Sequence, residues 1–453
     1  MLSAIVMAAG KGTRMNSNHA KTMHKVLDKP MIGHINDTLD SLSVNRKVFV
    51  VGYDGDSIRN YLKDSCQYAT QEELLGTAHA VMQASQLKDE EGKTLIINGD
   101  CPLIQKETYQ KMLDASEEYP LVLLTVKLED PAHYGRIVRD DNGDVQAIVE
   151  RKDCSKEQIE INEINVGIYC VDNQLLWKYI YEIDNNNKQH EYYITDLVKV
   201  FKKHGHKVTA VVSDDKDEMQ GINSPSELAS ANKWLQNKIN SQHMANGVVL
   251  VDPQNTYIGP DVKIGQDTTI YPNVRIEGKS VIGNDNIIEE GTVIINATIG
   301  NGNKIISSRV TDSQLDNNIS LGPNSHLRNN CHIYDNCRIG NFVEMKNVEF
   351  GTGSKCAHLT YVGDATVGEK CNFGCGVVTV NYDGKNKFRT TIGNHVFIGS
   401  NVNLIAPVTI ADNTVLAAGS TITDDVAEGD MAIARSRQQN KKGYGEKYLN
   451  KQH

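Results

Sequence analysis

The sequence has no apolar run long enough to span a lipid bilayer. Its apolar start, residues 1–10, lacks the basic leader and the small-residue cleavage site of a secretory signal peptide. We therefore expect no membrane insertion, and we expect the chain to remain in the cytoplasm. The 453 residues are enough for two or three domains, and their composition, 39% hydrophobic and 23% charged, is typical of a globular protein.

Excess positive charge and metal-type cysteine patterns are also lacking. The formal net charge is −10, which argues against general binding to nucleic acid. There are nine cysteines, an odd number, and none of them forms a CxxC pair. This pattern favours reduced thiols over a disulfide framework or a zinc site.

Residues 1–228 alternate between strand-length apolar segments and amphipathic stretches. The apolar segments lie at 3–8, 47–51, 94–98 and 121–126. The alternation predicts a mixed, mostly parallel α/β sheet of the Rossmann type, whose ligands bind at the carboxyl ends of the strands. A helix start at Ser224-Pro225 follows, and we assign 229–250 to a linker helix.

A different rhythm begins near Val251. Aliphatic residues recur at every sixth position from Ile258 to Ile294, and two further tracts follow after phase slips. Period six predicts short strands joined by tight corners, in which the repeated aliphatic residue stacks one coil above another. We therefore predict a parallel β-helix over 251–437 and a polar tail over 438–453. Such a repeat can also be a mere spacer or oligomerisation stalk.

A loop of small and basic residues, AAGKGTR at 8–14, follows the first predicted strand. Small residues let backbone N–H groups approach phosphate oxygens, and Lys and Arg neutralise their charge. The loop is neither a Walker A motif nor a GxGxxG turn. Further motifs follow in order at 21–31, 71–80, 96–103, 134–137, 148–152, 163–167 and 221–223. Together they resemble the motifs of the sugar-phosphate nucleotidyltransferase family.

That resemblance implies transfer of a uridylyl group from UTP to a sugar-1-phosphate with Mg²⁺. Two anions meet in this reaction, so positioning and charge neutralisation carry the catalysis. The implied catalytic residues are Lys21 and Arg14. The residues implied to bind UTP are Ala8, Ala9, Gly10, Lys11, Gly12, Gln71, Gly76 and Thr77, of which those at 71–77 belong to the stretch implied to read the uracil. The residues implied to meet the sugar are Gly135, Glu150 and Asn165. The oxygen ligands implied for Mg²⁺, a hard cation, are Asp100 and Asn223.

Several of these residues also have a purely structural interpretation. Asp100 could cap a helix, Asn223 could be a turn residue, and Glu150 could pair with a basic neighbour at the surface. The sequence also departs from the family pattern twice, because Ala20 replaces the usual Pro before the catalytic lysine and Asp28 replaces a Gly. The missing Pro puts the rigidity of that loop in question.

Two polar tracts interrupt the six-residue pattern. The first contains NFVEMK at 341–346 and HLTYVGD at 358–364; the second, NYDGKNKFR at 381–389, predicts a loop with Asp-Gly at its turn. Both are similar to the acetyltransferase domain of one family of two-activity enzymes. The whole chain therefore resembles the N-acetylglucosamine-1-phosphate uridyltransferase/glucosamine-1-phosphate N-acetyltransferase family.

This second resemblance implies a left-handed β-helix, a homotrimer and synthesis of UDP-N-acetylglucosamine. Glucosamine-1-phosphate would be acetylated by acetyl-CoA, and the resulting N-acetylglucosamine-1-phosphate would then be uridylylated with release of pyrophosphate. The implied base is His358, with Glu344 or Asn381 to orient the ring or the amine. The residues implied to bind glucosamine-1-phosphate are Arg328, Lys346, Tyr361, Asn372 and Lys387, and those implied to bind acetyl-CoA are Cys375, Asn381, Tyr382, Ser400, Ala418 and Arg435.

Residues of this half also have purely structural interpretations. His358 could be an ordinary corner histidine, and the basic residues of the 381–389 loop could be solvated charges. Cys375 also stands where the family usually has Ala. A chain with only the nucleotidyltransferase activity and a structural or regulatory β-helix is the competing interpretation, and a non-catalytic scaffold is the third.

Overall fold

The computed structural model describes residues 1–132 and 134–449, which divide into two compact units, one from Met1 to Leu235 and the other beginning at Gln236. The division falls inside α8 (Pro225–Ala245), which begins at the proline expected near its start. The predicted tail contains the exposed helix α9 (Tyr444–Leu449), and its last residues, 450–453, lie outside the described residues. Among the described residues, no helix combines the length and apolarity needed to cross a membrane.

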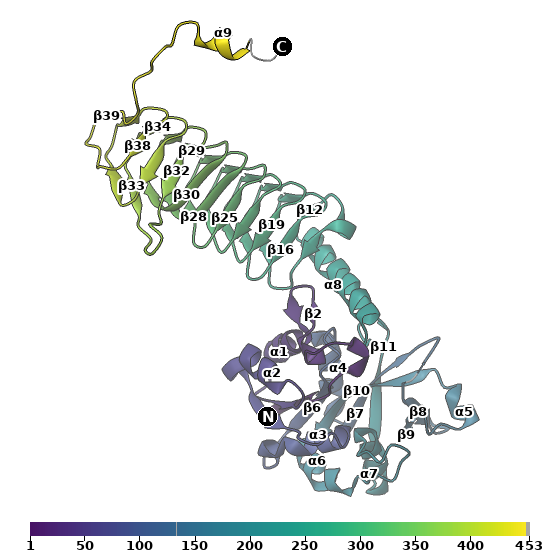
Figure 1. Ribbon diagram of the computed structural model, residues 1–453. Helices are drawn as coiled ribbons and strands as arrows, with labels where there is room; N and C mark the ends of the chain where they lie inside the picture. The colour runs from purple at the N-terminus through teal and green to yellow at the C-terminus, as the bar shows by residue number, and fades with distance from the viewer. Residues whose placement is uncertain (133, 450–453) are drawn as a thin grey trace. The chain divides into compact units, whose positions relative to one another are not determined.

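The first unit is built on a mixed nine-stranded sheet with the order β11-β7-β10-β6-β1-β4-β5, and β8 and β9 pair beside β10 (Figure 1). β10 runs antiparallel to β6 and β7, whereas the other neighbours on this path are parallel. The predicted mostly parallel α/β sheet is confirmed, and the four predicted strands are β1, β4, β6 and β7. The strands are β1 (Leu2–Ala8), β4 (Arg46–Val51), β5 (Gln67–Thr70), β6 (Lys93–Asn98), β7 (Leu121–Lys127), β8 (Arg136–Arg139), β9 (Val145–Val149), β10 (Glu163–Asp172) and β11 (Val208–Ser213).

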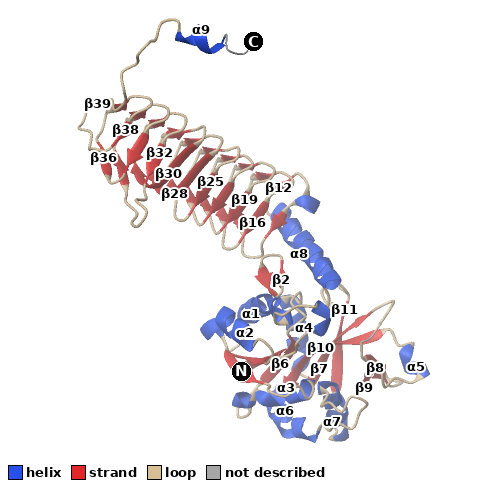
Figure 2. Ribbon diagram, in the orientation of Figure 1, coloured by secondary structure: helices blue, strands red, loops and turns tan. Residues whose placement is uncertain are grey.

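Helices cover both faces of this sheet (Figure 2). Ile5 of β1 packs in one core with α3, α6 and α7, whereas its neighbours Ala4 and Val6 pack in the other core with α1, α2 and α4. Because both faces are covered, the central strands are apolar at nearly every position. The helices are α1 (Met31–Ser41), α2 (Gly55–Leu62), α3 (Thr77–Gln83), α4 (Lys106–Ser116), α6 (Asn173–Tyr179) and α7 (Leu197–Lys203).

The order of the strands reverses direction beside β1. The chain passes from β1 to β4 and β5 on one side and then returns to place β6 on the other side of β1. Such a reversal is the topological switch point at which open α/β sheets bind ligands. The carboxyl ends of β1 and β6 therefore position the first candidate site.

The second unit is a β-helix of short parallel strands arranged in two sheets. One sheet has 11 strands, from β12 (Val249–Leu250) to β39 (Met431–Ala432), and the other has 17, from β13 (Tyr257–Ile258) to β38 (Thr421–Ile422). The repeated aliphatic residues face inward: Ile276, Ile294 and Val310 pair in register on three strands and are fully buried. The predicted parallel coil of hexapeptide repeats is confirmed.

The phase slips in the repeat are shortened corners. Several steps between consecutive core positions are five residues long, and strands on either side still pair, as Ile299 does with Leu315. The coil also continues through the first polar tract, where β28 (Val343–Phe350) and β30 (Thr360–Val367) run side by side. The buried core positions across the first slip are Ile294, Ile299, Ile305, Val310, Leu315 and Leu321.

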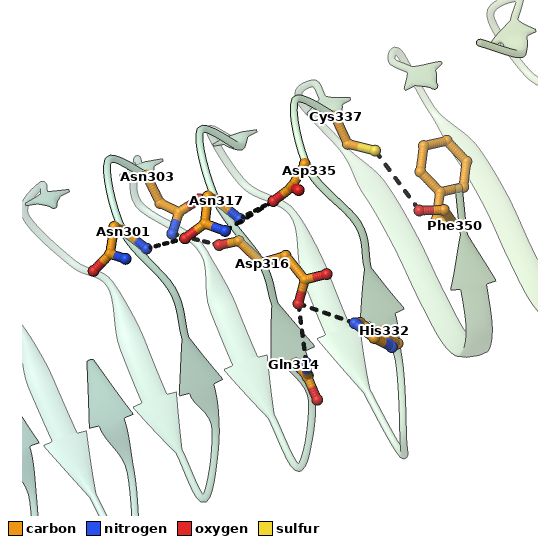
Figure 3. A network of polar contacts seen from close by, with 9 residues as sticks. All are labelled: Asn301, Asn303, Gln314, Asp316, Asn317, His332, Asp335, Cys337 and Phe350. Atoms are coloured by element: carbon orange, nitrogen blue, oxygen red, sulfur yellow. Dashed lines mark hydrogen bonds and ion pairs between the residues drawn. The ribbon is translucent and has the colours of Figure 1, made fainter. Parts of the chain in front are cut away.

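Corner side chains of successive coils form polar ladders (Figure 3). The Asn301 N–H donates to Asn317 Oδ1 at 2.8 Å, and the Asn317 N–H donates to Asp335 Oδ1 at 2.8 Å. The next residues, Asn318 and Asn336, have φ of 56° and 59°, a left-handed conformation that Asn tolerates better than most residues. The ladders thus pair backbone donors that tight corners would otherwise leave without partners.

Candidate active sites

The predicted phosphate loop follows β1 at the switch point of the sheet. Gly12 has a φ of +65°, and a Cβ at this position would lie 2.6 Å from the Cβ of Lys21. Both the backbone conformation and the available space therefore favour glycine. Lys11 and Arg14 are exposed, and the Lys11 ammonium lies 5.2 Å from the centre of the Tyr53 ring.

The small residues at the start of the loop pass from the buried end of β1 to the protein surface. Ala8 and Ala9 are buried at the end of β1. A Cβ at Gly10 would meet nothing within 4 Å, so the backbone there is open to a ligand. Small residues at this point let phosphate oxygens reach backbone N–H groups.

Beside this loop, Lys21, Asp100 and Asn223 meet from three distant parts of the chain. The Lys21 ammonium donates to Asp100 Oδ2 at 2.5 Å and to Asn223 Oδ1 at 2.9 Å. The Ile222 N–H donates to the Asp100 carbonyl at 2.9 Å, and Glu227 accepts from the Asn223 N–H at 2.7 Å. Two oxygens thus converge on one cation in a framework held by backbone hydrogen bonds.

This oxygen pair fits a magnesium ion. One carboxylate and one amide oxygen are hard donors, and Mg²⁺ usually takes few protein ligands and completes its shell with water and phosphate. Within the part of the chain that the structure describes, no three His, Cys, Asp or Glu side chains form a metal-binding group.

A second cluster contains the three residues predicted to meet the sugar. A Cβ at Gly135 would lie 3.5 Å from both carboxylate oxygens of Glu150, and the Asn165 N–H donates to the Gly135 carbonyl at 2.9 Å. The Asn165 amide in turn donates to the Tyr169 hydroxyl at 2.8 Å. Gly135, Glu150 and Asn165 are therefore brought together by the β8–β9 hairpin and β10.

Sequence reasoning missed Thr195, whose hydroxyl donates to Glu150 Oε1 at 3.4 Å. Thr195 and Glu150 line a cavity of about 560 Å³ that also carries Asp153, Glu182 and Asp184. Carboxylates accept hydrogen bonds from sugar hydroxyls and repel phosphate. No local motif marks Thr195, because it reaches Glu150 only through the packing of α7 and its preceding turn.

We expect Glu150→Gln to raise the KM for the sugar phosphate about tenfold, since one charged hydrogen bond contributes about 1.5–3 kcal/mol. Burial raises the pKa of Glu150, and neighbouring acids add to this effect, although the Thr195 hydroxyl opposes it. The folded state therefore keeps this proton to higher pH than the unfolded chain does. Stability falls as the pH rises from the ordinary pKa of glutamate through the raised pKa.

The glutamine of the Glu150→Gln variant does not titrate, so this side chain causes no loss of stability as the pH rises. The variant's Tm should therefore exceed that of the wild type increasingly across the same pH window, by a few degrees, because about 1 kcal/mol corresponds to about 2–4 °C in a domain of this size. Thermal melts between pH 4 and 8 measure the difference, with Glu118→Gln, an exposed carboxylate on the same unit, as the control. A difference in Tm that does not change with pH would contradict the raised pKa of Glu150.

The predicted uracil-binding residues form a fixed turn. Gln71 is buried, and its amide nitrogen contacts the Gly76 carbonyl and His79 Nδ1, both at 3.1 Å. Gly76 has a φ of +116°, and a Cβ there would lie 2.5 Å from the Tyr192 carbonyl oxygen. The Thr77 hydroxyl accepts from the Ile194 N–H at 2.9 Å, so this side chain has a structural contact.

The two departures from the family pattern have local explanations. Ala20 is fully buried with a φ of −54°, the conformation that proline would impose, and its N–H donates to Asp54 Oδ2 at 3.1 Å. A hydrogen bond that proline could not make therefore restrains the approach to Lys21. In the turn 27–28 the left-handed residue is Leu27, with φ 56°, and Asp28 is not among the left-handed residues, so this position does not require glycine.

In the β-helix, four predicted phosphate and sugar residues gather on the 17-stranded sheet. Arg328 lies beside Lys346 on adjacent coils, and Lys346 lies beside Gly363 on the next. A Cβ at Gly363 would lie 2.3 Å from the Tyr361 hydroxyl, so the Tyr361 ring folds over this glycine toward the same column. Lys387 reaches Lys346 from the 381–389 loop, and this contact, followed by burial, lowers the pKa of Lys346.

Repulsion between two ammonium groups costs free energy that a bound anion would remove. A third cation, Arg328, is already paired, since it donates two hydrogen bonds to Glu344 Oε1 at 2.9 and 2.6 Å. Glu344, considered above as an orienting group, is thus held by Arg328. Lys346 and Lys387 therefore carry positive charge that the Arg328–Glu344 pair does not neutralise.

His358, Cys375, Ser400 and Ala418 form one exposed corner column. The Gly376 N–H donates to the His358 carbonyl, and the next two coils repeat the pattern from Cys375 and Ser400, at 3.0, 2.7 and 2.8 Å. His358, the predicted base, therefore lies one coil from Cys375, a predicted acetyl-CoA residue. The spacing between neighbouring coils is about 4.8 Å, as between parallel strands. All four side chains are exposed.

The remaining predicted residues are more scattered. Asn381 is buried at the root of the loop, and the exposed Tyr382 donates its hydroxyl to the Gly384 carbonyl at 2.7 Å. Gly384 has a φ of 97° and forms the expected Asp-Gly turn. Arg435 is exposed beyond β39. Asn372 belongs to β31 (Asn372–Phe373) of the 11-stranded sheet and not to the sheet that carries the cation cluster.

The sequence matches two families and many curated relatives. Residues 3–257 match the family described as Nucleotidyl transferase, and 261–296 and 389–424 match Bacterial transferase hexapeptide (six repeats). Bifunctional protein GlmU of Geobacillus sp. (strain WCH70) is 47% identical over 97% of this chain and 97% of its own length. The chain belongs to the GlmU family. GlmU proteins of Listeria innocua serovar 6a and Latilactobacillus sakei subsp. sakei are 45% and 46% identical over 99% and 98% of this chain, and over 98% and 96% of their own lengths.

GlmU relatives match both units, whereas the hexapeptide match stops at 296 and resumes at 389. The coils between these points contain the shortened corners, the long strands β28 and β30, and the loop. They also carry Arg328, Lys346 and Tyr361. In this member of the GlmU family, the departures from the regular repeat therefore coincide with the predicted substrate residues.

Proposed function

We propose that this member of the GlmU family makes UDP-N-acetylglucosamine in two steps, one in each unit. The β-helix acetylates glucosamine-1-phosphate with acetyl-CoA, and the α/β unit then transfers uridylyl from UTP to N-acetylglucosamine-1-phosphate. The observation that carries this proposal is that each unit holds its own cluster of polar side chains with lysine: Lys21 with Asp100 and Asn223 in one, and Lys346 with Lys387 in the other. Both reactions handle a sugar phosphate, and each therefore requires such a cluster.

In the α/β unit, an oxygen of the sugar phosphate attacks the α-phosphorus of UTP. A P–O bond forms there, and the bond to the β-phosphate breaks, so pyrophosphate leaves. The loop backbone at Gly10, with Lys11 and Arg14, holds the phosphates, and Lys21 neutralises charge at the transferring phosphorus. Asp100 and Asn223 would hold Mg²⁺, which when bound supplies further neutralisation of the triphosphate.

In the β-helix, His358 takes a proton from the amine of glucosamine-1-phosphate. The nitrogen attacks the thioester carbon, a C–N bond forms, the C–S bond breaks, and CoA leaves as the thiol once protonated. Lys346 and Lys387 bind the phosphate and so hold the amine in position. The exposed column from Cys375 to Ala418 has small side chains, which leave room for an extended pantetheine.

We also propose that the protein is a cytoplasmic homotrimer. The outward residues of the last coils in the 11-stranded sheet are apolar: Phe397, Val415 and Met431 lie in register and are 52%, 37% and 59% exposed. Exposed apolar patches typically mark association sites. Faces of two copies packed side by side would also bring Asn372 of one sheet to the cation cluster of the other.

The test is to measure CoA release and pyrophosphate release separately in the full-length protein. We expect CoA release to require glucosamine-1-phosphate and acetyl-CoA and to persist in EDTA. Pyrophosphate release should require UTP and N-acetylglucosamine-1-phosphate, disappear in EDTA and return with added Mg²⁺. If CoA is not released, the β-helix is structural and the single-activity interpretation replaces this proposal.

A further inference from the structure

Asp364 occupies a corner column at the edge of the cation cluster. Strand pairing aligns Lys346 with Gly363 and Val348 with Ala365, which places Asn347 directly beside Asp364. Both residues have left-handed backbones, with φ of 53° and 48°. On the following coil, Tyr361 pairs with Val378, so the same column continues to Asn381. Asp364 is thus an aspartate between two asparagines on consecutive coils.

The carboxylate of Asp364 accepts a hydrogen bond from each neighbouring amide. Asn347 Nδ2 donates to Asp364 Oδ1 at 2.7 Å, and Asn381 Nδ2 donates to Asp364 Oδ2 at 2.5 Å. A carboxylate can only accept, so both amides must present nitrogen to it. The amide oxygen of Asn381 is therefore turned away from Asp364. Because Asn381 is only 9% exposed, its amide has little freedom to turn back.

The ionised form of Asp364 is favoured in this position. Burial would raise the pKa of Asp364, but the hydrogen bonds from Asn347 and Asn381, with the nearby charges of Lys346 and Lys387, outweigh burial and leave the pKa below its ordinary value. The carboxylate also offsets the repulsion between these two lysines. One side chain thus orders both the loop root and the cation pair.

We propose that Asp364 is a positioning residue for acetyl transfer, which fixes the Asn381 amide with its oxygen available to accept a hydrogen bond from the substrate amine. This inference rests on the proposed acetyltransferase activity. An amine held by one N–H presents its lone pair to the thioester in a defined direction, and misplacement by about 1 Å can reduce the rate about 100-fold. Asp364 itself touches the asparagine and not the substrate.

The first variant is Asp364→Asn, which keeps the size of the side chain. The asparagine at 364 can accept a hydrogen bond from one neighbouring amide with its oxygen, but it presents its own nitrogen to the other neighbour. Two nitrogens then face each other unless one of these amides turns. We expect kcat for CoA release to fall about 10- to 100-fold, with the KM values for glucosamine-1-phosphate and acetyl-CoA within about threefold of the wild type. Uridylyl transfer should not change.

The matched control is Asp335→Asn, at another coil corner (Figure 3). Asp335 accepts from the Asn317 N–H and Nδ2 with a single oxygen, Oδ1, at 2.8 and 2.9 Å, and an asparagine can do the same. This variant should keep the wild-type kcat. A loss of stability common to both variants, without the specific fall in kcat, would show that Asp364 is only a structural corner residue.

The decisive variant is the double change Asn347→Asp/Asp364→Asn, which moves the carboxylate by one coil. The carboxylate introduced at position 347 then accepts from the amide nitrogen at position 364, whose oxygen faces Asn381 and restores its orientation. We expect kcat to recover to within about threefold of the wild type, even if the single variant folds poorly. A folded double variant without recovery, or a single variant with normal kcat, overturns the inference; a wild type that releases no CoA overturns the proposed function itself.

Discussion

Replacing His358 by alanine is expected to reduce CoA release by about 10²- to 10⁴-fold, the usual contribution of a general base, and to leave uridylyl transfer unchanged. The coil uses the backbone of His358, which donates to the Asn341 carbonyl at 3.1 Å and accepts from Gly376 at 3.0 Å. Its side chain is exposed and can be removed without opening a cavity. The measurement is the rate of thiol appearance from acetyl-CoA at saturating glucosamine-1-phosphate.

His358→Asn is the companion variant, because position 358 has a φ of 63°. Alanine is strained in this left-handed conformation, whereas asparagine tolerates it and still lacks a base of neutral pKa. Equal losses in the two variants would locate the effect in the imidazole. Substantial activity in His358→Asn but not in His358→Ala would instead identify a backbone effect, and another residue would then have to be the base.

Asp100→Asn should reduce pyrophosphate release at least about 100-fold, since loss of a group that stabilises transition-state charge typically costs 10²–10³ in rate. The substitution keeps the shape but removes the only carboxylate that contacts Lys21 in the described cluster. The proposed metal ligand and the partner of Lys21, the proposed catalytic lysine, are lost together. CoA release, which takes place in the other unit, should not change.

The control for Asp100→Asn is Asp37→Asn, which removes the acidic partner of another lysine, Lys29, in the same unit. That aspartate is exposed, and such pairs contribute little to stability. The rate is best measured over a range of Mg²⁺ concentrations, because a weakened metal site should be partly rescued at high Mg²⁺. A normal rate at low Mg²⁺ would exclude Asp100 from the metal site.

Much of the architecture could be predicted from the spacing of apolar residues alone. The apolar segment at 121–126 became β7, and the aliphatic residue at every sixth position became the core of the coil. These patterns are local, because a residue's burial follows from the strand that contains it. The phase slips could not be interpreted, since a corner that loses one residue disrupts the sequence period without disrupting the strand pairing.

The order of the nucleotide motifs could be read from the sequence, but their contacts could not. Spacing does not reveal that Thr195 reaches Glu150, or that the N–H of Ala20 replaces the restraint of a proline. Asp364 lies inside a motif identified from the sequence, but its role depends on Asn347 and Asn381, which only the stacking of coils places on either side of it. Such contacts are set by tertiary packing.

The loop at 381–389 leaves the coil after Asn381, and pairing resumes when Thr390 meets Ala365. The chain returns to almost the point that it left. The pairing of the coils on either side therefore does not depend on how many residues the loop contains. Mutation can therefore lengthen, shorten or recharge this excursion with little consequence for folding. A scaffold of this kind separates what must be inherited unchanged from what can vary, and new substrate preferences can arise here at small risk to the rest of the protein.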